Sequence, residues 1–149
     1  MTTPEQRTPN IEDTWLFLHL MFETIWRYRF LYRDLNDLLT RNRKLEIAFQ
    51  KILDTKISIA ERLCQGLRSH GQLSLPEKEI KALATNMMVL ATYWLSYEHL
   101  RHARDFHQPK VIEAALSRGV YHVLSSLAPA LTGQARALFD QLASRYLGD

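Results

Sequence analysis

Apolar residues along the chain fall into long segments with helical spacing, separated by short polar connections. The first segment runs from Trp15 to Phe22, where only His19 is polar. A helix that is apolar nearly all round must be covered by neighbours on most sides. We therefore predict a central buried helix that is capped by Asn10 and ends near Tyr28.

Aromatic and arginine residues alternate over residues 26–34, directly after this apolar segment. Strict alternation is compatible with a strand, but no turn signal separates it from the helix before it. We interpret it as the end of the same helix, followed by a short helical turn at residues 34–39. Arg27, Arg29 and Arg33 could bind an acidic ligand or a phosphate. The preferred interpretation is that they pair with nearby acids and stack on aromatic rings; the acids are Glu23, Asp34 and Asp37.

The second long helix is predicted over residues 43–70, because its apolar positions recur three and four residues apart. Gly71 supplies its C-terminal stop. The third helix is expected to start with a capping box formed by Ser74 and Glu77. It carries no charge over residues 82–97, which predicts a second buried helix.

Two further helices complete the predicted fold. Pro109 begins the fourth, at a position where its missing amide proton costs nothing. Thr132 is the expected cap of the fifth helix, which has one apolar face and is closed by Gly148. The predicted fold class is all-α, with five main helices.

The composition of the 149 residues fits one ordinary soluble domain, with 46% hydrophobic and 23% charged residues. A formal charge of +3 is too small to indicate nucleic-acid binding by itself. The single cysteine, Cys64, excludes an internal disulfide and fits a reducing cytoplasm. Residues 1–9 are expected to be a disordered tail or a linker remnant, and residues 10–149 the helical domain. The sequence contains neither a signal peptide nor a membrane-spanning segment, so we expect a cytoplasmic protein.

The end of the third helix holds the only group of residues that resembles a metal site. A closed site needs about four ligands at fixed geometry, and Arg101 and Arg104 would repel a cation there. A solvated helix end is the preferred interpretation, and neither a metal nor a cofactor is predicted. The residues are Glu98, His99, His102, Asp105 and His107.

The two buried helices also contain isolated polar groups, which is typical of helices that line a ligand pocket. His19 is a candidate ligand contact, although a satisfied core histidine is the preferred interpretation. Asn86 is costly to bury without partners for its amide. Core packing remains the commoner role for the aromatic and methionine residues around them. The candidate lining residues of a cavity between the two helices are His19, Phe22, Trp26, Asn86, Met87, Leu90, Tyr93 and Trp94.

Two groups of residues carry a family resemblance. The first is Phe22-Glu23 followed by residues 26–30 and 32–35, and the second is residues 118–121 leading to residues 127–129. Over about residues 9–147 the chain resembles the ligand-binding and dimerisation domain of TetR-type transcriptional repressors. The resemblance implies a homodimer that holds a small apolar or amphipathic ligand.

In that family the last two helices pair with their copies as a four-helix bundle. Gly119 lies inside a predicted helix, where glycine costs about 0.5–1 kcal/mol relative to alanine, so we expect that it serves close packing. The expected dimer-interface residues are Ala115, Gly119, Val123, Ser126, Phe139, Leu142 and Tyr146.

The resemblance also implies an N-terminal helix-turn-helix domain that grips the operator. Only residues 1–9 precede the first predicted helix, so we expect that this domain is absent here and that the chain does not bind DNA on its own. The leading hypothesis is the ligand-sensing and dimerisation domain of a TetR-like regulator. An alternative is a free-standing helical interaction module with no small-molecule ligand. An enzyme using Glu98, His99 or His102 is the weakest hypothesis, and no catalytic residue is predicted.

Overall fold

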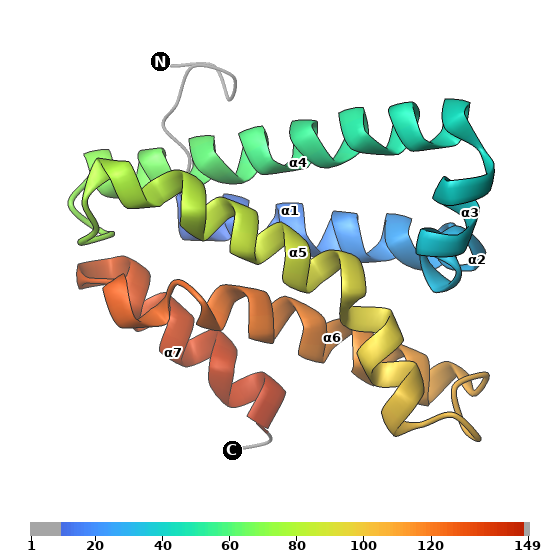
Figure 1. Cartoon of the computed structure of the whole chain (residues 1–149). Coiled ribbons are helices and arrows are strands. Elements are labelled where there is room, and N and C mark those ends of the chain that lie inside the picture. Colours follow the sequence, from blue (N-terminus) through green and yellow to red (C-terminus); the bar gives the residue numbers. More distant parts are fainter. Residues whose placement is uncertain (1–9, 148–149) are drawn as a thin grey trace, which may run out of the picture.

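The computed structural model describes residues 10–147, so the prediction for residues 1–9 lies outside the described part. The described residues form seven α-helices and one short 3-10 helix (Figure 1). The all-α prediction is confirmed, but the helices number seven rather than five. They are α1 (Ile11–Arg27), α2 (Arg29–Arg33), α3 (Leu35–Arg41), α4 (Arg43–Ser69), α5 (Glu77–Arg101), α6 (Pro109–Ser125), η1 (Ala128–Ala130) and α7 (Gly133–Leu147).

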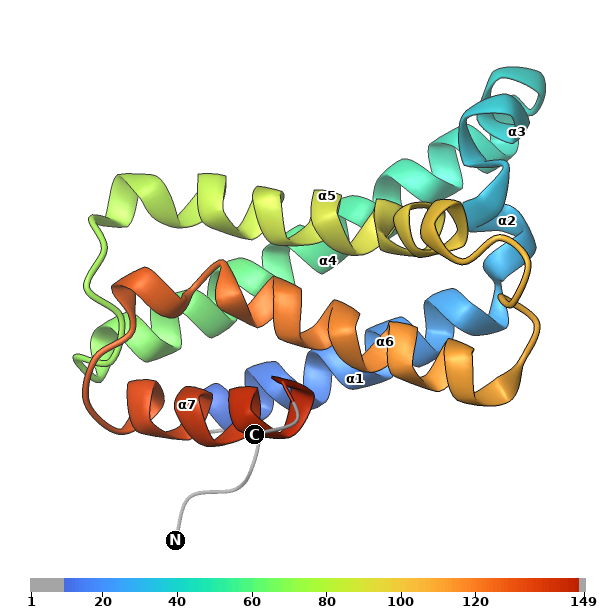
Figure 2. The same ribbon diagram turned by 90° about the horizontal axis from the view of Figure 1, so that it is seen from below.

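The helices pack as a bundle in which α4, α5 and α6 run antiparallel in turn (Figures 1 and 2). Helix α5 contacts α4 and α6, and α1 lies alongside α6 and also touches α4 (Figures 1 and 2). Helix α7 closes one end by packing on α6 and α1. None of the helices that the structure describes is long and apolar enough to cross a membrane.

Local signals fix several helix ends where the sequence predicted them. Asn10 and Asp13 form a reciprocal capping box at the start of α1, with backbone contacts of 3.1 and 2.8 Å. At the end of α4, Gly71 has a φ of +70°, a conformation that glycine adopts at little cost. The Gly71 and Gln72 amides donate to carbonyls of the last turn, which completes a Schellman motif.

The predicted capping box at the start of the third helix was wrong. Pro76 is the N-cap of α5, and no side chain caps that end. The Ser74 amide instead donates to the Ala130 carbonyl oxygen at 2.8 Å, beside an isolated bridge between Leu73 and Leu131. This pairing holds Ser74 against the segment before α7, outside the N-cap position. The Thr132 hydroxyl likewise donates to the Gly71 carbonyl oxygen.

The aromatic–arginine segment is divided between the end of α1 and a separate short helix, α2, and the short helical turn predicted at residues 34–39 corresponds to α3. Helix α1 stops at Tyr28, and Asp34 separates α2 from α3, both with ψ near 30°. The breaks allow Tyr32 to become buried, where its ring packs edge-on against Phe49 of α4 at 5.5 Å. The apolar pattern alone predicted one continuous helix, whereas tertiary packing determines where the helix breaks.

The prediction that the third helix is buried on nearly all sides was wrong. Helix α5 contacts α4, α6 and α2, and the face that points away from them is exposed. Absence of charge does not by itself indicate burial, because much of a protein surface is apolar. The exposed residues of this face include Asn86, Val89, Tyr93, Ser96, Tyr97 and Leu100. Helix α1 similarly exposes Leu16 and Leu20.

Candidate functional site

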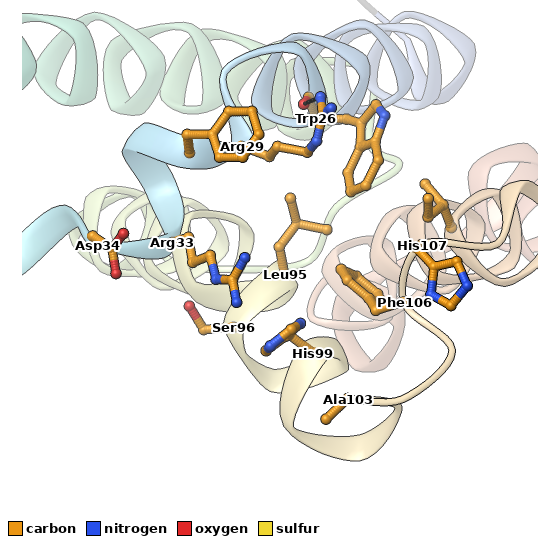
Figure 3. Close-up of a pocket in the computed structure, with 12 residues that line it drawn as sticks. Trp26, Arg29, Arg33, Asp34, Leu95, Ser96, His99, Ala103, Phe106 and His107 are labelled. Carbon is orange, nitrogen blue, oxygen red and sulfur yellow. Dashed lines mark hydrogen bonds between the residues drawn. The ribbon is translucent and has the colours of Figure 1, made fainter.

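A cavity of about 580 Å³ lies at the end of the bundle where α1 meets α2, and where α5 leads into α6 (Figure 3). This volume is within the usual range for sites that bind small molecules, roughly 300–1,000 Å³. The lining combines aromatic and aliphatic side chains with several that are polar or charged. The residues are Trp26, Arg29, Phe30, Arg33, Asp34, Leu95, Ser96, His99, Ala103, Phe106, His107 and Ile112.

Phe106 is the centre of the apolar wall. Its ring lies edge-to-face with Trp26 of α1 at 6.0 Å and with His99 of α5 at 5.5 Å between centroids. Edge-to-face packing of this kind is favourable beyond the area that it buries. The connection between α5 and α6 is thereby held against α1, and it closes one side of the cavity.

Arg29 is fixed in position by the aromatic residues on either side of it. Its guanidinium lies 4.5 Å from the Trp26 ring centroid and 4.9 Å from that of Phe30. Its Nη1 also donates to the Trp26 carbonyl oxygen at 3.1 Å. The expected stacking of this arginine on aromatic rings is therefore present.

The prediction that the three arginines of the aromatic–arginine segment pair with acids was wrong within the described residues, 10–147. No ion pair there joins Arg27, Arg29 or Arg33 to a carboxylate. Asp37 instead pairs with Arg41, one helical turn away. The helix break at Asp34 separates α2 from α3, and Asp37 and Arg41 both lie in α3, where they pair with each other.

Of the lining residues that the sequence predicted, only Trp26 borders this cavity. Phe22, Met87 and Trp94 are buried in the core between α1, α5 and α6. Leu90 is half-buried. Asn86 and Tyr93 lie on the exposed face of α5, where the Tyr93 hydroxyl donates to Asn36 at 3.3 Å. Apart from Trp26, the residues predicted to line a cavity between the two helices therefore lie outside this one.

His19 lies away from the cavity, in a cluster between α1 and α7. The Tyr146 hydroxyl is 3.0 Å from His19 Nε2 and accepts a hydrogen bond from Trp15 Nε1 at 2.9 Å. Burial lowers the pKa of His19 below its usual value, against the opposing effect of Glu23. The preferred interpretation of a satisfied histidine agrees with these contacts.

Four residues expected at a dimer interface are buried in the core of this protomer. They are Ala115, Gly119, Val123 and Phe139. A Cβ atom on Gly119 would lie 2.7 Å from Phe22 Cζ and 2.8 Å from Trp94 Cδ1. The close packing that requires this glycine therefore comes from the same chain and not from a second copy. Ser126, Leu142 and Tyr146 are half-buried.

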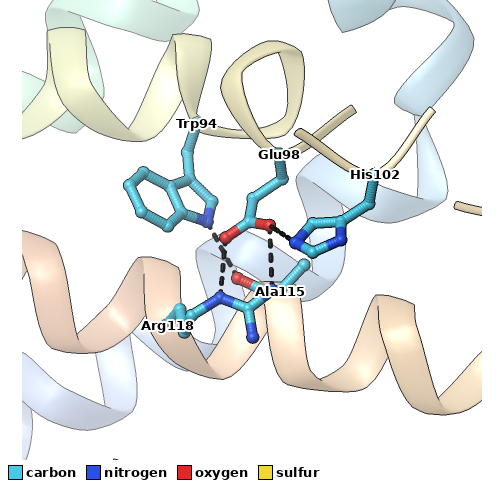
Figure 4. A network of polar contacts seen from close by, with 5 residues as sticks. All are labelled: Trp94, Glu98, His102, Ala115 and Arg118. Carbon is cyan, nitrogen blue, oxygen red and sulfur yellow. Dashed lines mark hydrogen bonds and ion pairs between the residues drawn. The ribbon is translucent and has the colours of Figure 1, made fainter. Parts of the chain in front are cut away.

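A buried ion pair joins α5 to α6 one turn from the cavity (Figure 4). Glu98 is 2% exposed, and its carboxylate accepts hydrogen bonds from Arg118 Nε and Nη2, both at 2.8 Å. His102 Nε2 lies 3.7 Å from the same carboxylate. The hydrogen bond to Glu98 raises the pKa of Arg118 above its usual value, against the opposing effect of burial. Sequence reasoning grouped Glu98 with the histidines and missed Arg118 as its partner, since the two are distant in sequence.

Cys64 is fully buried on the apolar side of α4. Burial and the nearby Glu61 raise the pKa of its thiol to about 12. The thiolate is the reactive form of cysteine, so this environment makes Cys64 an unreactive core residue.

Comparisons with known proteins identify the family. The model of the TetR family, described as a bacterial transcriptional repressor, matches residues 1–139. A TetR-family transcriptional regulator from Marinobacter aquaeolei VT8 has a similar structure, with a TM-score of 0.78 and 26% sequence identity. That match covers 97% of this chain and 66% of the other, so the chain spans just under two thirds of that regulator. No curated protein matches the chain. Because the family model matches most of its residues, the chain belongs to the TetR family.

Proposed function

We propose that residues 10–147 form the ligand-sensing and dimerisation part of a TetR-family transcriptional regulator, acting in the cytoplasm without catalysis. The observation that carries this proposal is the cavity of about 580 Å³, with its mixture of aromatic, aliphatic and charged side chains. Sites for small ligands usually have this size and this composition. Membership of the family supports a regulatory role for such a site.

The position of the cavity suggests how binding affects the rest of the protein. Ile112 of α6 and Phe106 of the preceding connection both border it. A ligand against these residues would favour one position of α6 relative to α1. The Glu98–Arg118 ion pair joins the end of α5 to the same helix, so the two helices are expected to respond together.

Dimerisation through α6 and α7 remains part of the proposal, with a revised contact surface. Because the buried residues cannot meet a partner, the surface must consist of side chains that this protomer leaves accessible. Several uncharged residues on α6 and α7 are exposed or half-buried, and most of them are small, which allows helices to approach closely. Ala114, Ala137 and Gln141 are exposed, and Ser117 and Ser144 are half-buried.

Specific recognition of DNA is proposed to need a helix-turn-helix unit in addition to these helices. Sequence-specific binding requires side chains that reach base edges in a groove. Helices α1 and α5 each bury one face in the core, residues 82–97 of α5 carry no charge, and the charged residues of α4 are of both signs. Any binding of DNA by residues 10–147 is expected to be weak and to decrease steeply with salt.

Ligand sensing is tested by thermal denaturation with a panel of small amphipathic molecules of differing charge. A compound that binds only the folded state raises the melting temperature. Ser96→Trp places a large ring at the cavity without altering the buried core, since Ser96 is exposed there. We expect stabilisation of the wild type that Ser96→Trp abolishes. If no compound stabilises the wild type, the chain is better described as an interaction module without a ligand.

A further inference from the structure

We propose that the cavity binds an amphipathic monoanion, a carboxylic acid with an apolar body, whose carboxylate is held by Arg29 and Arg33. This inference deepens the proposed ligand-sensing function and rests on it. The charges and the contacts at the cavity support it.

The first observation is an excess of positive charge at the α2 side of the cavity. Arg29 and Arg33 both border it, and neither has a carboxylate within ion-pair distance in the part of the chain that the structure describes. Arg33 extends from α2 toward the α5 side of the cavity (Figure 3). An anion placed between the two guanidinium groups would supply the missing partner and form charge-assisted hydrogen bonds.

The second observation is that Arg29 is already in a fixed position. Its stacking between Trp26 and Phe30 and its bond to the Trp26 carbonyl restrict its side-chain rotamers. A guanidinium has further N–H donors beyond the one used in this bond. Because the side chain is ordered before binding, less conformational entropy is lost when it holds a ligand.

The third observation limits the charge of the ligand. Asp34 also borders the cavity, and its carboxylate offsets one of the two guanidinium charges. One excess positive charge suits a monoanion. A dianion such as a phosphate monoester would exceed that charge and would be repelled by Asp34. A neutral ligand would leave the arginines without an anionic partner.

The rest of the lining defines the body of the ligand. Leu95, Phe106 and Ile112 present aromatic and aliphatic surface at the cavity, and the Trp26 ring, on which Arg29 stacks, adds to it. An alkyl chain or a planar aromatic system would bury apolar area against them, at roughly 25 cal/mol per Å² removed from water. His99 and His107 are the remaining ionisable residues at the cavity, and in their neutral form they add no net charge.

A matched pair of fluorescent probes tests this proposal on the intact chain. Anilinonaphthalene sulfonate is an amphipathic monoanion, and phenylnaphthylamine is the same ring system without the charge. We expect the anionic probe to bind the wild type about tenfold more tightly at low salt, because two charged donors face it. Decanoate should displace it more effectively than decanamide or decyl phosphate.

Substitution of single arginines tests which side chains hold the anionic group of the probe. Arg33→Gln should lower the affinity for the anionic probe about five- to tenfold and leave the affinity for the neutral probe unchanged. Arg27→Gln is the matched control, because Arg27 is exposed on α1 and does not border the cavity. It should change neither affinity. The double variant Arg29→Gln with Arg33→Gln should remove the preference for charge altogether.

The outcomes separate this inference from the proposed function. If both probes bind equally, or if Arg27→Gln weakens the anion as much as Arg33→Gln does, the charge proposal is overturned while ligand binding stands. If decyl phosphate displaces the probe better than decanoate, the limit to a monoanion is overturned. If neither probe binds the wild type, and if decanoate, decanamide and decyl phosphate all leave the melting temperature of the protein unchanged, the charge proposal and the ligand-sensing proposal both fail.

Discussion

Glu98 on α5 and Arg118 on α6 form a bidentate ion pair, with both contacts at 2.8 Å and the carboxylate almost fully buried. Removing one partner of a buried pair leaves a charge without compensation, which is far more costly than losing an exposed pair. The Arg118 side chain is 39% exposed, so water screens part of this effect.

Arg118→Met is therefore expected to lower the free energy of unfolding by about 2–3 kcal/mol, as measured by urea denaturation. The control is Arg41→Met, which removes an exposed pair with Asp37 and should cost less than about 1 kcal/mol. Equal losses in the two variants would show that the Glu98–Arg118 pair contributes no more than a surface contact.

Gly119→Ala tests why a glycine lies inside α6. The added methyl group would meet the buried rings of Phe22 and Trp94 at less than 3 Å. Overpacking of this kind typically costs about 1–3 kcal/mol. Where there is room for the methyl group, replacing a helical glycine with alanine instead stabilises the protein by about 0.5–1 kcal/mol. Calorimetry should show a lower melting temperature for Gly119→Ala and almost no change for Ser117→Ala. An unchanged or higher value for Gly119→Ala would contradict the packing.

Protonation of His19 should destabilise the protein in mild acid. Its pKa is lowered in the folded state, chiefly by burial. The unfolded chain therefore binds the proton more readily, so the stabilising contribution is present above about pH 6.5 and is lost as the pH falls through the folded pKa. Urea denaturation across this range should show a decrease in stability that His19→Gln reduces. The same slope in the variant would assign the effect to another group.

The proposed dimer is tested by charge introduced on the exposed faces of α6 and α7. Ala114→Arg and Ala137→Arg should shift the sedimenting mass toward the monomer, since like charges would meet across a two-fold axis. Ala82→Arg, on the exposed start of α5, should leave the mass unchanged. A wild type that sediments as a monomer at high micromolar concentration would exclude the dimer.

Helix boundaries could be predicted from sequence wherever a local signal determines them. Asn10 caps α1, Asn42 caps α4 through the Leu45 amide, and Gly71 ends α4 because its positive φ suits glycine. Pro109 likewise begins α6. The breaks at Tyr28 and Asp34 carry no such signal, since burial of Tyr32 against Phe49 depends on a helix that follows later in the chain.

The cavity could be predicted only in part. The sequence indicated Trp26, and binding of an acidic ligand by the neighbouring arginines was the less favoured alternative; both Arg29 and Arg33 border the cavity. Phe106 and Ile112 were missed, because their position depends on how the connection between α5 and α6 folds back. Asn86 was misplaced because an uncharged sequence does not reveal which face of α5 its neighbours cover.

The most direct test of ligand binding at this cavity uses the indole N–H signals of the three tryptophans. Trp26 borders the cavity, whereas the indoles of Trp15 and Trp94 are bonded to Tyr146 and to the Ala115 carbonyl oxygen. Titration of ¹⁵N-labelled protein with decanoate should shift the Trp26 signal in a saturable manner and leave the other two nearly unchanged. A shift confined to Trp15 or Trp94, or no saturable shift at all, would contradict binding at this site.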